Sequence, residues 1–248
     1  MPDNEDIHAG ARQRSKPPSV PRKLDLAQFA SVEDAISRIE PGDRYVDIGK
    51  KLDLISVAPG ASGSTLTFFW LSMLSRGEGL HQAIAREARH ANPVAVFPLI
   101  RAFLEAVVLV MYVTDHPEYV KVLGRRPSEL PEHGPKRKSM QALLAAVSKR
   151  APGAKAVYGE LSEITHFGAT AMWTAHVAIG ERATEDGEPL TVMWTNSPRW
   201  KNDEQAMIAC AQTLELANEM VAALTCFARR HVLPLWRPTD AGTATRGS

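Results

Sequence analysis

The chain has 248 residues, of which 44% are hydrophobic and 23% are charged, and its formal net charge is +1. This composition is typical of a globular protein with a hydrophobic core, and it excludes a disordered or low-complexity chain. A nearly neutral chain has no general electrostatic attraction to nucleic acid or to an anionic membrane. We expect a single helical domain at residues 23–236, with tails at residues 1–22 and 237–248.

The compartment is predicted from the N-terminal segment, the cysteines and the most apolar stretch. The N-terminal segment is polar, contains prolines and lacks the apolar region of a secretory signal. Cys210 and Cys226 fall in one predicted helix about 24 Å apart, which is too far for a disulfide. The apolar stretch 94–114 contains Arg101 and Glu105, each costing about 3 kcal/mol near the middle of a membrane span. We therefore expect a cytoplasmic protein that contacts no membrane.

Helix-start and helix-stop residues divide the chain into predicted elements. Ser31 begins a short helix that ends before Pro41-Gly42, and a second short helix covers residues 45–57. Asn92 followed by Pro93, and Asn202 with Gln205, are expected at helix starts. The core helices are predicted at residues 64–91, 93–115, 136–150, 154–173 and 202–232.

A hairpin is predicted between the last two core helices. The stretches 176–181 and 189–195 flank Glu185-Asp186-Gly187-Glu188, and apolar alternation around Asp-Gly is a strong hairpin signal. The predicted fold is mainly α. It is a bundle of four to five core helices with short N-terminal helices and one β-hairpin insertion at about 176–195.

A candidate site follows from two of the predicted core helices. Arg101 and Glu105 lie one turn apart on a helix that is otherwise apolar. Tyr158, Ser162 and His166 recur at every fourth position and form a polar stripe on a later helix. If the helices pack together, Glu105 orients His166 as an acid or base, and Arg101 holds an anion beside it. The alternative is a structural ion pair within a satisfied hydrogen-bond network.

The same residues carry a resemblance. The chain resembles an uncharacterised family of bacterial all-helical proteins at Arg101-Ala102-Phe103-Leu104-Glu105 and at Tyr158-Gly159-Glu160-Leu161-Ser162 with His166. In that family an R-x-x-x-E helix precedes a Y-x-x-L-S-x-x-x-H helix, a hairpin and a last long helix. The resemblance covers about residues 65–232. The family is similar in turn to the HEPN group of small helical domains, many of which are RNA-cleaving toxins or defence proteins that act as dimers.

The resemblance implies a homodimer that binds RNA or a nucleotide-like anion at Arg101 and His166, with metal-independent cleavage as a further expectation. Such cleavage needs a base for the 2′-hydroxyl and a cation for the charge on the phosphorane. The HEPN signature R-x(4–6)-H is not matched, because Arg101 is followed by Glu105 and no histidine stands at positions 106–108. The triplet Arg229-Arg230-His231 is too tightly spaced to replace it.

Two other classes of function stay open. One is a non-enzymatic helical interaction module. The other is a di-metal carboxylate bundle enzyme, because E-x-x-H, a ligand motif of such bundles, begins at Glu78, Glu87 and Glu163 in the predicted core helices. Its ligands would be Glu78, His81, Glu105, Glu163, His166 and Glu215 or Glu219. We expect His81 to face solvent, which counts against this set, and we predict no cofactor.

A basic cluster extends from the end of the second predicted core helix to the start of the third. Acidic residues are interspersed in it, so a solvated loop is the expectation in preference to an RNA-binding face. The cluster consists of Lys121, Arg125, Arg126, Lys136, Arg137 and Lys138.

Overall fold

The computed structural model describes residues 24–51, 64–131, 134–165, 177–182, 191–195 and 198–233. This part of the chain is mainly helical, as the sequence predicts. The eight α-helices are α1 (Val32–Arg38), α2 (Arg44–Lys51), α3 (Thr65–Arg89), α4 (Pro93–Asp115), α5 (Val120–Leu123), α6 (Met140–Val147), α7 (Ala154–Thr165) and α9 (Asp203–Phe227). Short 3-10 turns lie at Pro117–Tyr119 and Pro127–Glu129, and a π-helical turn at Ala228–Val232 extends α9.

Polar caps fix the predicted helix starts. The Asn92 side chain accepts a hydrogen bond from the Ala95 N–H at 3.3 Å, directly before α4. Asn202 accepts one from the Gln205 N–H at 2.9 Å at the start of α9, and Gln205 accepts one from the Lys201 N–H at 2.8 Å. These bonds satisfy backbone donors that have no partner inside a helix. Both predicted caps are therefore confirmed.

The segment between α4 and α7 differs from its predicted form. The predicted helix 136–150 is shorter, because Ser139 caps α6 through the Ala142 N–H and the helix ends at Val147. The stretch before it holds α5 and two 3-10 turns. The predicted start is too early, because residues 136–138 are Lys-Arg-Lys and lie before the Ser139 cap.

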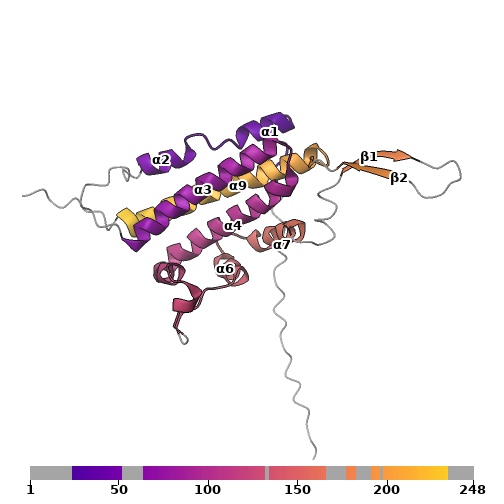
Figure 1. Cartoon of the computed structure of the whole chain (residues 1–248). Helices are drawn as coiled ribbons and strands as arrows, with labels where there is room; N and C mark the ends of the chain where they lie inside the picture. The colour runs from indigo at the N-terminus through magenta and orange to yellow at the C-terminus, as the bar shows by residue number, and fades with distance from the viewer. Residues whose placement is uncertain are drawn as a thin grey trace, which may run out of the picture.

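The helices form layers around α4 (Figure 1). Helices α3 and α9 run side by side and both pack on one side of α4, while α1 and α2 cover their outer face. Helices α6 and α7 pack on the other side of α4. A helix that contacts others all around its surface has to be apolar on every side. Most of α4 is accordingly buried.

Helix α4 is also the one described helix that is long and apolar enough to cross a membrane. In its most apolar 18-residue window, 56% of the residues are buried inside the protein. Core helices of globular proteins show the same length and composition. The apolar character of α4 is accounted for by its contacts with α3, α6, α7 and α9.

The long helices α3 and α9 are joined by a buried tryptophan. Trp70 donates its indole N–H to the carbonyl of Leu224 at 3.0 Å. The rings of Phe69 and Phe227 lie 5.4 Å apart between the same helices. Aromatic pairs of this kind add to the free energy of area burial. These contacts fix the register of α3 against α9.

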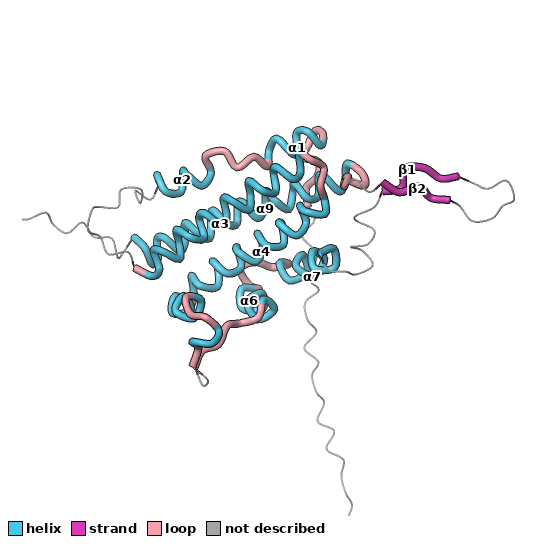
Figure 2. The backbone as a smooth tube through the Cα atoms, viewed as in Figure 1, coloured by secondary structure: helices cyan, strands magenta, loops and turns pink. Residues whose placement is uncertain are grey.

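Two strands, β1 (Val177–Arg182) and β2 (Thr191–Thr195), form an antiparallel pair (Figure 2). Val177 lies opposite Thr195 and Arg182 opposite Thr191. The register shifts between Ala178 and Gly180, as in a β-bulge.

Candidate functional site

Helices α4 and α7 bring three of the five predicted site residues together. Arg101 donates from Nη2 to the Tyr158 hydroxyl at 2.8 Å and from Nη1 to Oγ1 of Thr165 at 2.9 Å. Its Nε lies 3.3 Å from Oε1 of Glu105, and its guanidinium carbon lies 4.9 Å from the centroid of the Tyr158 ring. We call Arg101, Glu105, Tyr158 and Thr165 the arginine cluster. Its charge, hydrogen bonds and ring contact hold the guanidinium in one place.

The other two predicted site residues do not join the cluster in the same way. Ser162 donates its hydroxyl to the Tyr158 carbonyl at 2.6 Å, as serines inside helices often do. His166 lies outside the described residues. Thr165, which the sequence analysis missed, lies seven positions after Tyr158 and so on the same helix face. Extending the periodicity from Tyr158 by two turns would have found it.

The arginine cluster is partly open to solvent. The Arg101 side chain is 20% exposed and the Glu105 side chain is 35% exposed. A guanidinium has five N–H donors, and three of those on Arg101 face Glu105, Tyr158 and Thr165. The cluster therefore holds the Arg101 guanidinium in a fixed place, and its carboxylate partner reaches the surface.

Glu105 also lines a groove of about 600 Å³, which we call the α3–α6 groove. Its α3 wall comes from residues spaced three and four apart, so one face of that helix lines it. Helices α4, α5 and α6 supply the rest of its lining, together with the 3-10 turn before α5 and the chain between α5 and α6. The α3 residues that line it are Thr65, Phe68, Phe69, Ser72, Met73 and Arg76.

Three cations line the α3–α6 groove, against one carboxylate. Arg76 is exposed and forms no hydrogen bond or ion pair with another described residue. Arg137 donates to the carbonyls of Leu123 at 3.2 Å and Arg125 at 2.6 Å, which holds the chain between α5 and α6. The third cation is Lys138. Two members of the predicted basic cluster thus lie against a groove, where the sequence predicted only a solvated loop.

A buried tyrosine–histidine pair lies on the opposite side of α3. His81 has no exposed surface, so the expectation that it faces solvent is wrong. Its Nδ1 lies 3.2 Å from the Tyr45 hydroxyl, and its ring packs near Phe103. Burial, together with the charge of Arg44, lowers the pKa of His81 to about 4. Burial also raises the pKa of Tyr45.

The predicted di-metal ligands are not assembled in the part of the chain that the structure describes. Within those ranges no three histidine, cysteine, aspartate or glutamate side chains gather closely enough to hold a metal ion. His81 is directed to Tyr45 instead of to carboxylates. Its neighbours make it a member of the core.

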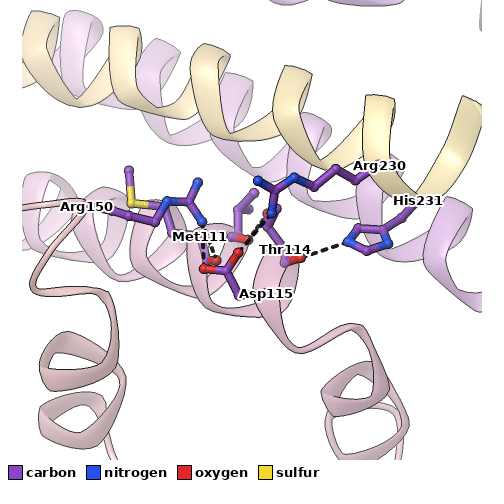
Figure 3. Close-up of polar contacts among 7 residues, drawn as sticks. Met111, Thr114, Asp115, Arg150, Arg230 and His231 are labelled. Carbon is purple, nitrogen blue, oxygen red and sulfur yellow. Dashed lines mark hydrogen bonds and ion pairs between the residues drawn. The ribbon is translucent and has the colours of Figure 1, made fainter.

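A further polar cluster closes the end of α4 (Figure 3). The Asp115 carboxylate lies between two guanidinium groups, with Arg150 at 3.0 Å and Arg230 at 3.0 Å. Arg150 also donates to the Met111 carbonyl at 3.1 Å, and the His231 Nε2 lies 2.8 Å from the Thr114 carbonyl. Cations at a helix C-terminus compensate its exposed carbonyls and its dipole. The cluster therefore ties α4 to the chain before α7 and to the end of α9.

The triplet Arg229-Arg230-His231 thus has a structural role. Its last two residues lie in the π-helical turn and contact the end of α4. Without the turn, the side chains would leave α9 at other angles.

Comparison with known proteins finds no relative of the chain. No protein-family model, no curated protein and no solved structure matches the chain.

Proposed function

We propose that the protein binds RNA, or a nucleotide-like anion, in the α3–α6 groove beside the arginine cluster. The observation that carries this proposal is the exposed guanidinium of Arg76, which meets no carboxylate in the described part of the chain. Lys138 and Arg137 line the same groove, whereas Glu105, the one carboxylate among its described lining residues, is paired with Arg101. The groove thus favours an anion.

The apolar part of the groove supports a ligand that carries a base. Phe68 is 61% exposed at the groove, and an aromatic ring in the open can stack on a nucleobase. The volume of about 600 Å³ lies within the range of small-molecule sites, about 300–1,000 Å³. A nucleotide with its phosphate near the cations and its base near Phe68 would contact both the charged and the apolar residues of the groove.

The arginine cluster would lie at the edge of the bound anion. Cleavage without a metal would need His166 as the base and Arg101 as the cation that stabilises the phosphorane. Tyr158 and Ser162 would then position Arg101 and the helix that leads to His166. Glu105 would orient the imidazole, as the sequence analysis expects.

The assembly and the finer fold belong to the same proposal. We propose a HEPN-like cytoplasmic homodimer with four to five core helices and a hairpin insertion at about 176–195. The resemblance at Arg101 and Tyr158 supports it.

Binding is tested with a short fluorescent single-stranded RNA in titrations followed by anisotropy. The double variant Arg76→Gln/Lys138→Gln should lose about tenfold or more in affinity at low salt. Each contact between a cation and a phosphate releases counterions from the RNA, and the variant loses the binding free energy of two such contacts. Arg86→Gln on the same helix removes an exposed charge outside the groove and should bind as the wild type does. Equal affinity of the double variant and the wild type would refute the groove.

Cleavage is tested on the same RNA by gel electrophoresis in the presence of a chelator. Wild-type protein should shorten the RNA, and His166→Ala should leave it intact while still binding it. Intact RNA with the wild-type protein would limit the function to binding.

A second candidate function is an interaction module in which the arginine cluster is purely structural. The observation that favours it is the engagement of Arg101 with Glu105, Tyr158 and Thr165. In that case, Arg101→Ala would lower stability, and neither it nor the Arg76→Gln/Lys138→Gln variant would change RNA affinity.

A further inference from the structure

A cavity of opposite charge lies on the other side of α4. Helices α7 and α9 both pack on α4 but hardly touch each other, which leaves an opening between them. The opening is a cavity of about 170 Å³, which we call the α7–α9 cavity. Its floor is formed by four buried residues of α4, Leu104, Val107, Val108 and Met111.

The size of the cavity sets the size of its occupant. An apolar protein cavity of about 150 Å³ takes up one benzene molecule. The α7–α9 cavity is slightly larger and has an apolar floor, so it admits an apolar body of about this size. Small residues keep it open at the start of α7, where Gly153 has a φ of +93° and no atom within 4 Å of the place of a Cβ.

The rim of the cavity carries carboxylates. Glu215 and Glu219 lie on one face of α9 together with Gln212 and Leu216, and Glu160 faces them from α7. Neither Glu160 nor Glu219 forms an ion pair with another described residue. The cation that lines the cavity, Arg150, is paired with Asp115 at 3.0 Å. Among the residues that the structure describes, Glu160 and Glu219 therefore give the rim a negative charge.

The side chain of Gln212 has an acceptor without a hydrogen-bond donor, which is a second observation that favours a bound molecule. Its Oε1 is buried and accepts no hydrogen bond from any residue that the structure describes. Buried amide oxygens almost always have a partner. Gln212 lines the α7–α9 cavity and also the adjoining hollow of about 280 Å³ at the start of α9, as Glu160 does. An N–H group of a molecule in the cavity would supply the bond.

We propose that the α7–α9 cavity binds a small organic ammonium ion whose apolar body is about as large as a benzene ring. The body lies on the floor formed by α4, and the ammonium donates to Gln212 and lies near Glu160 and Glu219. The neutral rim of an ordinary core cavity would not distinguish a cation from an anion. This site is separate from the proposed nucleotide site, because the α3–α6 groove has the opposite charge.

The test uses three probes of one shape, namely benzylammonium, benzyl alcohol and benzoate, with the full-length protein. Binding is measured by saturation-transfer NMR and calorimetry. Benzylammonium should bind with one site per chain, benzyl alcohol about fivefold more weakly and benzoate more weakly still. If benzoate binds as well as benzylammonium, or if benzylammonium does not bind, the proposal fails.

Variants separate the charge of the rim from the shape of the cavity. Glu160→Gln/Glu219→Gln should lower the affinity for benzylammonium about tenfold and leave that for benzyl alcohol unchanged. Ala156→Phe, at an exposed lining position of α7, should block all three probes. Glu118→Gln removes an exposed carboxylate elsewhere and should change nothing. Unchanged benzylammonium affinity in the double glutamine variant would overturn the proposal, whatever the RNA assays show.

Discussion

At the scale of single residues, His81 differs most from what the sequence predicts. It occurs in an E-x-x-H motif on a helix with polar residues around it, a pattern typical of an exposed ligand. The structure places it in the core beside Tyr45 and Phe103. Which face of α3 is buried depends on how α4, α9 and the N-terminal helices pack against it, and no local pattern contains that information.

The burial of His81 predicts a pH-dependent stability. Its pKa is about 4 in the folded protein and about 6.5 when unfolded. Between these pH values the unfolded chain binds more protons than the folded chain. The free energy of unfolding therefore has its highest value above pH 6.5 and falls as the pH decreases to 4. The loss amounts to about 3 kcal/mol. Urea denaturation at several pH values should show it.

His81→Gln should flatten this pH dependence, since it removes the titrating ring. The exposed His90 serves as the control, because His90→Gln should retain the slope of the wild type. An unchanged slope in His81→Gln would contradict the assignment.

The arginine cluster predicts a graded loss of stability. Tyr158→Phe removes the hydroxyl that accepts from Arg101 but keeps the ring beneath the guanidinium, so we expect a loss of about 1 kcal/mol. Arg101→Ala should cost about 2–3 kcal/mol, because it leaves the partly buried Tyr158 and Thr165 without their donor. Chemical denaturation measures both.

Tyr112→Phe is the matched control for Tyr158→Phe. Tyr112 is buried as well, but its hydroxyl forms no hydrogen bond with another described residue. This change should therefore alter stability by less than Tyr158→Phe does. Equal losses would show that the Arg101 bond contributes nothing.

At the scale of elements, the ends of the long helices could be predicted, because their causes are local. Asn92 and Asn202 occupy the capping positions that their neighbours indicate. The meeting of Arg101 with Tyr158 could be predicted as well, because charges on a core helix need polar partners. The partner Thr165 and the α7–α9 cavity could not, since they depend on the rotation of α7 and on its distance from α9.

Two glycines of α3 give a matched pair of predictions. A Cβ on Gly79 would have no neighbour within 4 Å, so Gly79→Ala should raise the free energy of unfolding by about 0.5–1 kcal/mol. A Cβ on Gly77 would lie 3.1 Å from Cγ of Met220 and 3.4 Å from Cε1 of Tyr45. Gly77→Ala should therefore raise the free energy of unfolding by less than Gly79→Ala does, or lower it. Denaturation midpoints compare the two, and an equal gain would contradict the close packing of α3 on α9.

At the scale of the whole molecule, the layers leave part of α3 uncovered. Phe68 is 61% exposed and Leu71, one turn later, is 42% exposed. Large apolar side chains that lie together at the surface favour association. Phe68 lines the α3–α6 groove, whereas Leu71 lies outside it, so the Leu71 side of this surface fits the homodimer proposed above.

Leu71→Glu tests the dimer without changing the groove, because Leu71 is not among the residues that line it. Sedimentation velocity of the wild-type chain should give the mass of a dimer, and the variant should sediment as a monomer. A monomeric wild type at high concentration would contradict the proposal.

The central position of α4 also determines how the molecule opens. Helices on both sides cover it, so its amide hydrogens meet solvent only when the surrounding layers separate. Deuterium uptake in α4 should then be the slowest of the chain and should follow global unfolding, whereas α1 and α6 should exchange through local fraying. Mass spectrometry after timed labelling would record this order, and the protection of α4 would measure the stability of the whole bundle.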